Sequence, residues 1–440
     1  MDLIEPVANP SRSSFDVRRF AGDAGLAVGG ALIANAFNYV FHAMLSRSLG
    51  PTNYGTLAAL ISIAAIMGVI GSAINVVAMR ETARMWAAHD DGAIVGFVRR
   101  TAWYATGIGA AAAVALLAGA PLLAGYLHVA QPFVWLAFAL YLLVGITASY
   151  ARGAAQGAHR FGLFAASLIT EAIVKLASAL ALVALGFAVF GAMGGLAIGS
   201  AAGLAVVMFA MARRRNVDKP AVVGAAVATD HLRLGSESLK VLAVSAGTTA
   251  LVFLDPIFAK HHLDGQTAGF YGAAGTLARI IPFAVGLISL ILMPKSAALH
   301  RSSRASLERV LQVTFGAGIA GSLFGLLCAW LVPGLLVRVM FGAQFGPAAT
   351  ILPLYAVDAS LIAICIMGTS YLVAVGDYAI GWYVFAAVAA EAVLMAVFGL
   401  TPFRLIGIGI AANALLLPAI VTHTWRSVKE APVVDASPSL

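Results

Sequence analysis

Residues 163–211 read LFAASLITEAIVKLASALALVALGFAVFGAMGGLAIGSAAGLAVVMFAM, and this stretch decides the fold class. It carries only two charged side chains, Glu171 and Lys175, and divides into two apolar runs, 163–187 and 191–211, around a tight turn. An α-helix needs about 20 apolar residues to cross the hydrocarbon core of a bilayer. A membrane-spanning β-strand would instead alternate apolar and polar residues over about ten positions. The stretch therefore predicts two consecutive transmembrane helices.

The whole chain has the composition of a membrane protein. Of its 440 residues, 61% are hydrophobic and only 10% are charged, whereas a soluble domain is about 25% charged. Too few polar residues remain to cover a water-facing surface, which excludes a soluble multi-domain enzyme. The net charge of +8 comes from basic residues between apolar runs. That pattern is typical of a membrane protein with a basic cytoplasmic face and argues against binding to nucleic acid.

Apolar runs of this kind recur along the chain and predict an all-α integral membrane protein with about 12 transmembrane helices. Polar segments divide it into a cytoplasmic N-terminal segment (1–22), a six-helix bundle (23–211), a cytoplasmic linker (212–238), a second six-helix bundle (239–425) and a cytoplasmic tail (426–440). Basic residues are concentrated in one set of alternate loops. Because such loops stay on the cytoplasmic side, we expect a multi-pass protein of the inner (cytoplasmic) membrane with both termini in the cytoplasm.

The two predicted bundles resemble each other in sequence. Residues 49–55 are similar to residues 263–272, and Gly157 and Gly162 match Gly376 and Gly381 at one constant offset. Two repeats of six helices keep the same orientation and are related by an axis along the membrane normal. Such a pair of bundles predicts a central cavity, as in an alternating-access transporter.

Four short motifs occur in order along the predicted spans: residues 46–51 with Tyr54-Gly55, residues 152–161, residues 341–345 and residues 407–411. With these motifs the chain resembles the polysaccharide transporter (oligosaccharide flippase) family of the multidrug/oligosaccharidyl-lipid/polysaccharide exporter superfamily. The resemblance implies two six-helix bundles around a central cavity and rocker-switch alternating access. It also implies export of a glycan carried on polyprenyl pyrophosphate for surface polysaccharide synthesis. The drug-extruding branch of the superfamily remains the alternative, followed by a membrane polysaccharide polymerase or ligase, against which the short outer loops argue.

Polar side chains inside the apolar runs are the candidates for substrate binding, because a charge in the bilayer costs about 2.5–3.5 kcal/mol on insertion scales. They are Arg279, Lys175, Asn35, Asn38, His42, Arg80 and Arg152. Arg279 and Lys175 suit an anionic head group, although Arg279 would alternatively pair with Asp255 or reach the interface. Asn35, Asn38 and His42 share one helix face, which either lines the cavity or joins helices. Arg80 and Arg152 are either cytoplasmic anchors or a receiving site at the inner mouth.

The candidates for ion coupling are Asp358, Glu171, Asp255 and Glu391. Asp358 has no local partner in its span. Glu171 precedes Lys175 by four residues, a spacing that suits an ion pair within one helix; such a pair either specifies packing or opens to a ligand. Asp255 stands before Pro256, which predicts a broken helix that either holds a cation or merely ends there.

The sequence predicts neither an enzyme nor a bound cofactor or metal. It contains no Walker loop, and no His/Cys/Asp cluster has metal-ligand spacing. We expect a monomer whose partners are the lipid-linked oligosaccharide and membrane lipid. Polysaccharide polymerase machinery is a further expected partner, and nucleic acid is not.

Overall fold

The structure, a computed structural model, describes residues 17–88, 91–213 and 236–432. The predicted N-terminal segment up to residue 16, most of the linker and the end of the tail lie outside the described residues. Within the described ranges every regular element is a helix, which confirms the predicted all-α membrane fold.

The first half of the chain contains α1 (Val17–Ala87), α2 (Asp91–Leu127), α3 (Pro132–Gly157), α4 (Phe161–Leu182), the π-helical turn η1 (Val183–Phe187) and α5 (Ala188–Ala212). The second half contains α6 (Ser236–Phe253), α7 (Asp255–His262), α8 (Gly265–Ala278), α9 (Ile280–His300), α10 (Arg304–Leu331), α11 (Pro333–Phe341), the 3-10 turn η4 (Ala343–Phe345), α12 (Ala348–Val375), α13 (Ile380–Phe398) and α14 (Pro402–Glu430).

Element α1 is two antiparallel helices joined at Gly50. The backbone of Gly50 has φ 71° and ψ 170°, a conformation outside the helical region that a residue without a side chain adopts easily. His42 and Tyr54 lie on either side of it, and Nδ1 of the histidine is 2.9 Å from the tyrosine hydroxyl. Twelve residues of straight helix would separate them by about 18 Å. The chain therefore reverses at Gly50, within the loop predicted from the sequence.

The second reversal joins α4 to α5. Gly186 (φ 92°) and Ala188 (φ 42°) have positive φ values there. Beyond this turn the two helices pack so closely that a methyl group added at Gly195 would lie 2.5 Å from Cβ of Ala179. Among the described residues, ten helical stretches are long and apolar enough to cross a membrane. Two of them, Gly25–Ala87 and Phe161–Ala212, each reverse once, so the ten stretches provide the predicted twelve crossings.

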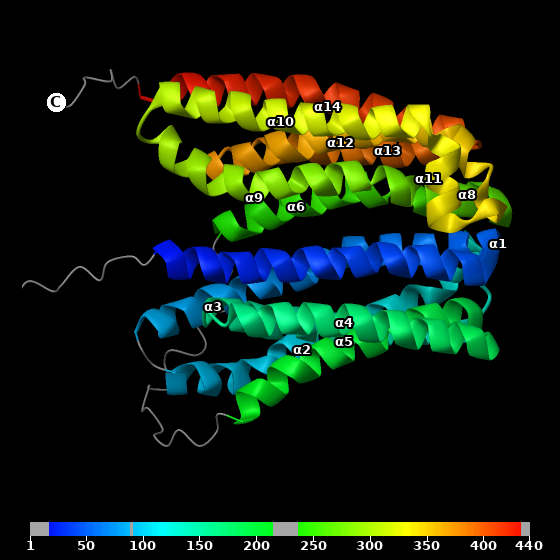
Figure 1. Ribbon diagram of the computed structural model, residues 1–440, viewed down its shortest axis with the longest axis horizontal. Helices are drawn as coiled ribbons and strands as arrows, with labels where there is room; N and C mark the ends of the chain where they lie inside the picture. The colour runs from blue at the N-terminus through cyan, green and yellow to red at the C-terminus, as the bar shows by residue number, and fades with distance from the viewer. Residues whose placement is uncertain (1–16, 89–90, 214–235, 433–440) are drawn as a thin grey trace, which may run out of the picture.

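The helices form two bundles, and α1 lies along the side of the first bundle that faces the second (Figure 1). In Figure 1, α2, α3, α4 and α5 lie on one side of α1, and the helices from α6 to α14 lie on the other. The end of the molecule at which α1 begins and α14 ends is called the terminal end below. The opposite end, where the chain reverses at Gly50 and where α11 lies, is called the distal end.

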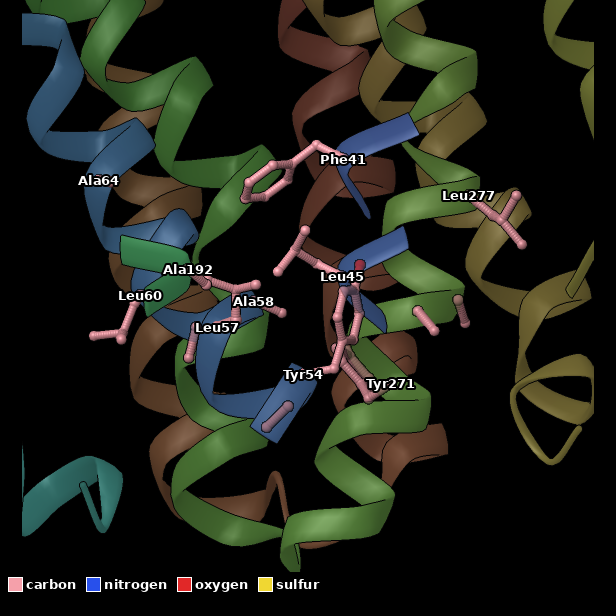
Figure 2. Close-up of a cluster of buried hydrophobic side chains, with 14 of the residues drawn as sticks. Phe41, Leu45, Tyr54, Leu57, Ala58, Leu60, Ala64, Ala192, Tyr271 and Leu277 are labelled. Carbon is pink, nitrogen blue, oxygen red and sulfur yellow. The ribbon is translucent and has the colours of Figure 1, made fainter. Parts of the chain in front are cut away.

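At the distal end the two bundles are in direct contact through α1 and α8. A methyl group added at Gly55 would lie 2.7 Å from the backbone nitrogen of Gly269, and one added at Gly269 would lie 2.0 Å from the carbonyl oxygen of Pro51. Only glycine permits so close an approach of two backbones. Figure 2 shows Tyr54 of α1 near Tyr271 of α8, both fully buried in one apolar core that continues from bundle to bundle. These tyrosines belong to the two similar segments recognised in the sequence.

Side chains around this contact strengthen it. The amide of Gln344, in η4, donates hydrogen bonds to the carbonyl oxygens of Ser46 (3.3 Å) and Arg47 (3.2 Å). Arg47 in turn donates to the carbonyl oxygen of Val339 in α11, at 2.6 Å. The distal end is therefore closed by backbone contacts, an apolar core and hydrogen bonds between the bundles.

Candidate functional site

A cavity of about 450 Å³ lies between the two bundles. One part of its wall is apolar, and the remainder is polar. The polar lining residues are Asn35, Asn38, Tyr39, His42 and Ser62 of α1, Tyr141 of α3, Glu171 and Lys175 of α4, and Thr276 and Arg279 at the end of α8. The structure thus brings together five of the seven predicted substrate-binding residues and one of the four predicted for ion coupling.

The first span supplies one continuous polar face to the cavity. Asn35, Asn38, Tyr39 and His42 are spaced by three, one and three residues, so they point to the same side of the helix. Of the two alternatives left by the sequence, this face lines the cavity. Tyr39 was absent from the predicted set, although its position four residues after Asn35 was a signal that it belonged there.

Lys175 projects its ammonium group into the cavity. It donates a hydrogen bond to the side-chain oxygen of Asn38 and lies 5.2 Å from the ring centre of Phe41. No carboxylate of the described residues forms an ion pair with it. The predicted pair with Glu171 is therefore wrong, because Glu171 is bound elsewhere. A cation in the membrane interior without a counter-ion is costly, so this site favours an anion.

Glu171 is bound instead by Arg152, which reaches it from α3. Nη2 of Arg152 donates to one carboxylate oxygen, and the hydroxyl of Ser200 donates to the other at 3.0 Å. Nε of Arg152 donates to the hydroxyl of Ser167 at 3.0 Å. The side chain of Arg152 is only 12% exposed, so the prediction of an anchor at the cytoplasmic surface is wrong. Arg152 binds Glu171 in preference to Lys175 because its planar guanidinium group can donate hydrogen bonds to two acceptors at once.

Behind this ion pair lies a second, smaller cavity of about 90 Å³. Tyr141 and Glu171 line both cavities. Arg152 and Ser149 line the smaller one. The Arg152–Glu171 pair therefore lies between the large cavity and a smaller, partly polar space within the first bundle.

Arg279 is held in a buried network of the second bundle. Its Nη2 donates to the carboxylate of Asp255 at 2.9 Å and to the hydroxyl of Tyr355 at 3.0 Å. Tyr355 donates its own hydroxyl to the other carboxylate oxygen. Of the alternatives for Arg279, the ion pair with Asp255 is present. The two N–H groups on Nη1 have no recorded partner in the described part of the chain, and Arg279 lines the cavity.

The predicted helix break before Pro256 explains how Arg279 is positioned. Helix α6 ends at Phe253 and α7 begins at Asp255. In a continuous helix the carbonyl of Val252 would accept a hydrogen bond from residue 256, but proline has no N–H. The unpaired carbonyl accepts instead from Nε of Arg279, at 2.8 Å. The break therefore serves the arginine, and Asp255 is its counter-ion.

The remaining predicted residues do not line the cavity. Asp358 is buried in α12 and accepts a hydrogen bond from Nδ2 of Asn413 in α14, at 3.0 Å, so the expectation that it lacks a partner holds only within its own span. Glu391 of α13 is 1% exposed, and its Oε2 has no hydrogen-bond partner among the described residues. Arg80 is an exposed residue of α1 toward the terminal end.

Comparison with known proteins agrees with this architecture. The family model described as polysaccharide biosynthesis protein matches residues 22–300. The chain belongs to this family. No curated protein matches the chain.

Solved structures similar to the chain are transporters of the superfamily predicted from the sequence. An inward-facing multidrug resistance MATE family transporter of the MOP superfamily has 15% identity and a TM-score of 0.65, over 89% of this chain and 94% of that one. An outward-facing structure of that kind has 12% identity and a TM-score of 0.65, over 94% and 97%. A MOP superfamily transporter from Pyrococcus furiosus has 12% identity and a TM-score of 0.56, over 94% and 96%. These likenesses show that the chain has the fold of these transporters.

Proposed function

We propose that the protein moves a polyprenyl-pyrophosphate-linked oligosaccharide across the inner membrane by alternating access, for surface polysaccharide synthesis. The observation that carries this proposal is the ammonium group of Lys175, which lies in the cavity between the bundles without a carboxylate partner. Arg279 lines the same cavity and supplies a second cation to its wall. A pyrophosphate is the anion that such a site suits, because charge-assisted hydrogen bonds to phosphate oxygens are strong.

The balance of charge around the cavity supports an anionic substrate. The described charged groups in its wall or paired with those of the wall are the cations Lys175, Arg279 and Arg152 and the carboxylates of Asp255 and Glu171. With both ion pairs formed, one positive charge remains, and it resides on Lys175. A cavity built for cationic drugs would need a surplus of negative charge instead.

The apolar part of the wall supports a substrate with a long hydrocarbon chain. Phe283 of α9 is 50% exposed and Leu32 of α1 is 46% exposed, and both line the cavity. They come from different bundles, and both present apolar surface to the cavity. A lipid-linked substrate would place its charged head group on the polar wall and its tail along these side chains.

The orientation and the energy source belong to the same proposal. With both termini in the cytoplasm of a multi-pass inner-membrane protein, the closed distal end faces outward. Moving each negative charge outward across an inside-negative membrane is favourable by about 2.3 kcal/mol per 100 mV. The membrane potential would therefore assist export of a pyrophosphate. The candidates for ion coupling are the carboxylates of Asp358, Glu171, Asp255 and Glu391.

We also propose that the protein is a monomer without enzymatic activity. Its two bundles would comprise residues 23–211 and residues 239–425.

The similarity to multidrug transporters over nearly the whole chain favours a second candidate, a cation-coupled drug exporter. A membrane polysaccharide polymerase or ligase is a third, less favoured candidate. The three differ in what accumulates in cells that lack the protein. A flippase defect leaves glycolipid on the inner leaflet, an exporter defect changes drug sensitivity, and a polymerase defect changes polymer length.

The test is complementation of a deletion strain with Lys175→Ala. We expect polyprenyl-linked oligosaccharide to accumulate on the inner leaflet of spheroplasts and surface polysaccharide to be lost. Lys240→Ala is the matched control, since Lys240 contacts the ring of Tyr378 outside the cavity. Normal transport by a fully inserted Lys175→Ala protein would contradict the proposed role of this lysine. If the deletion strain itself still presents full-length glycolipid on the outer leaflet, the flippase assignment is wrong.

A further inference from the structure

We propose that Tyr39 is a substrate-contacting residue, whose hydroxyl donates a hydrogen bond to a phosphate oxygen held between Lys175 and Arg279. The inference rests on the proposed function, and it adds a residue that neither the sequence motifs nor the family match assigns. Tyr39 lies on the cavity-facing side of α1, between Asn38 and His42.

The hydroxyl of Tyr39 is buried and has no hydrogen-bond partner among the described residues. A buried tyrosine hydroxyl nearly always has a hydrogen-bond partner in the protein. Without one, the loss of its hydrogen bonds to water would not be compensated. An unpaired one at the wall of a cavity therefore indicates a group whose partner is supplied by the ligand.

Two polar side chains that line the cavity near Tyr39, those of His42 and Ser62, are satisfied within the protein. His42 is hydrogen-bonded to Tyr54, and Tyr54 to Thr276 at 3.1 Å. The hydroxyl of Ser62 donates to the carbonyl oxygen of Ala58 at 2.9 Å. Of the residues recorded as lining the cavity, Tyr39 alone has a buried side-chain polar atom without a partner.

The surroundings of Tyr39 indicate the chemical class of its partner. Arg279 lines the same cavity as Tyr39. One residue before Tyr39, Asn38 receives the ammonium group of Lys175. A ligand atom that meets this hydroxyl therefore lies in a field of two cations, which suits an anionic oxygen rather than a sugar hydroxyl. The phenol is then the donor and the phosphate oxygen the acceptor.

This assignment has a structural consequence. Tyr39 and Lys175 belong to the first bundle and Arg279 to the second. A pyrophosphate bound by all three joins the bundles across the cavity, where their apolar side chains are otherwise exposed. The hydroxyl thus contributes to recognition at the point where the two bundles approach the same ligand.

The experiment compares Tyr39→Phe with the wild-type protein in detergent, using farnesyl pyrophosphate as the probe. The substitution removes one oxygen atom and keeps the ring. We expect binding of the probe to weaken about tenfold or more, as for loss of one hydrogen bond to a charged group. We expect the ligand-free protein to unfold at the same temperature or a higher one, because an unpaired buried hydroxyl has been removed. Tyr104→Phe is the matched control, since Tyr104 is 39% exposed and lies outside the cavity, and it should bind the probe as the wild type does.

Two results would overturn the inference. Binding by Tyr39→Phe equal to that of the wild type would show that the hydroxyl does not touch the ligand. A lower unfolding temperature of the ligand-free variant would show that the hydroxyl has a structural partner. If either occurs while Lys175→Ala still loses binding, the inference about Tyr39 fails and the proposed function stands. If the wild-type protein does not bind the probe, both fail together.

Discussion

Replacing Gly269 with alanine should open the distal end. Gly269 lies on α8 where it faces Pro51 of α1, and the contact joins the two bundles. An alternating-access transporter must separate its bundles at this end to face outward. A side chain that fits only the separated form should therefore shift the equilibrium toward it.

The structure gives the size of the clash. The new methyl group would lie 2.0 Å from the carbonyl oxygen of Pro51, whereas ordinary van der Waals contact begins at 3.4 Å. The two helices must move apart by about 1.4 Å to restore ordinary contact between the methyl group and this oxygen. The oxygen belongs to the backbone, so it cannot rotate away as a side chain can. Overpacking of this kind costs about 1–3 kcal/mol. If this free-energy cost applies to the closed form alone, it shifts the equilibrium from the closed to the open form by about 5- to 150-fold.

Thiol accessibility measures this shift. Ser62 lines the cavity, so Ser62→Cys, in a chain whose Cys328 and Cys365 are replaced by serine, reports on access to it. A membrane-impermeant maleimide added to spheroplasts reaches the reporter only from the outer face. We expect Gly269→Ala to raise the labelling rate at least fivefold.

A matched glycine separates the effect of the contact from that of helix propensity. Gly316 lies in α10, and a methyl group there would meet nothing within 4 Å. Both substitutions favour the helix equally, but Gly316→Ala should leave labelling unchanged. If Gly269→Ala is folded and labels at the wild-type rate, or if both variants label faster, the Gly269 contact does not govern opening.

Two further predictions concern the buried charges of the second bundle. Arg279→Gln leaves the carboxylate of Asp255 buried without its cation, so thermal unfolding should show a free energy of unfolding lower by about 3–5 kcal/mol. The double variant that also carries Asp255→Asn should recover most of that loss. Equal stability of the single and double variants would refute the pairing. Asp358→Asn keeps a side chain that accepts from Asn413 but removes the charge, so transport in proteoliposomes should lose its dependence on an ion gradient while the protein stays folded. Persistence of that dependence would remove Asp358 from the coupling machinery.

Much of the fold was predictable because membrane helices obey local rules. Runs such as residues 163–211 are set by bilayer thickness, and the reversal at Gly50 lies in the loop predicted there. Most of the cavity-lining candidates were predictable for a related reason. A charged or amide side chain inside an apolar run cannot face lipid cheaply, so Lys175, Asn38 and Arg279 had to point inward.

The partners of these side chains were not predictable in the same way. The four-residue spacing of Glu171 and Lys175 considers one helix alone, whereas Arg152 reaches Glu171 from another helix, nineteen residues earlier in the chain. Asp358 likewise finds Asn413 at a separation of 55 residues. Local spacing ranks the pairs available within one helix, and tertiary packing then offers pairs of better geometry.

The two cavity cations have different physical surroundings, and this separates their tasks. Arg279 is neutralised by Asp255 and also hydrogen-bonded by a backbone carbonyl that a proline leaves unpaired, so most of its binding capacity is used within the protein. Lys175 has one amide oxygen and an aromatic ring, and its charge is not compensated. Removing Arg279 therefore chiefly costs stability, whereas removing Lys175 relieves a desolvated charge and chiefly costs affinity for an anion. Because the surplus charge lies in the first bundle, a bound pyrophosphate is drawn first to α4, and Arg279 of the second bundle completes its recognition.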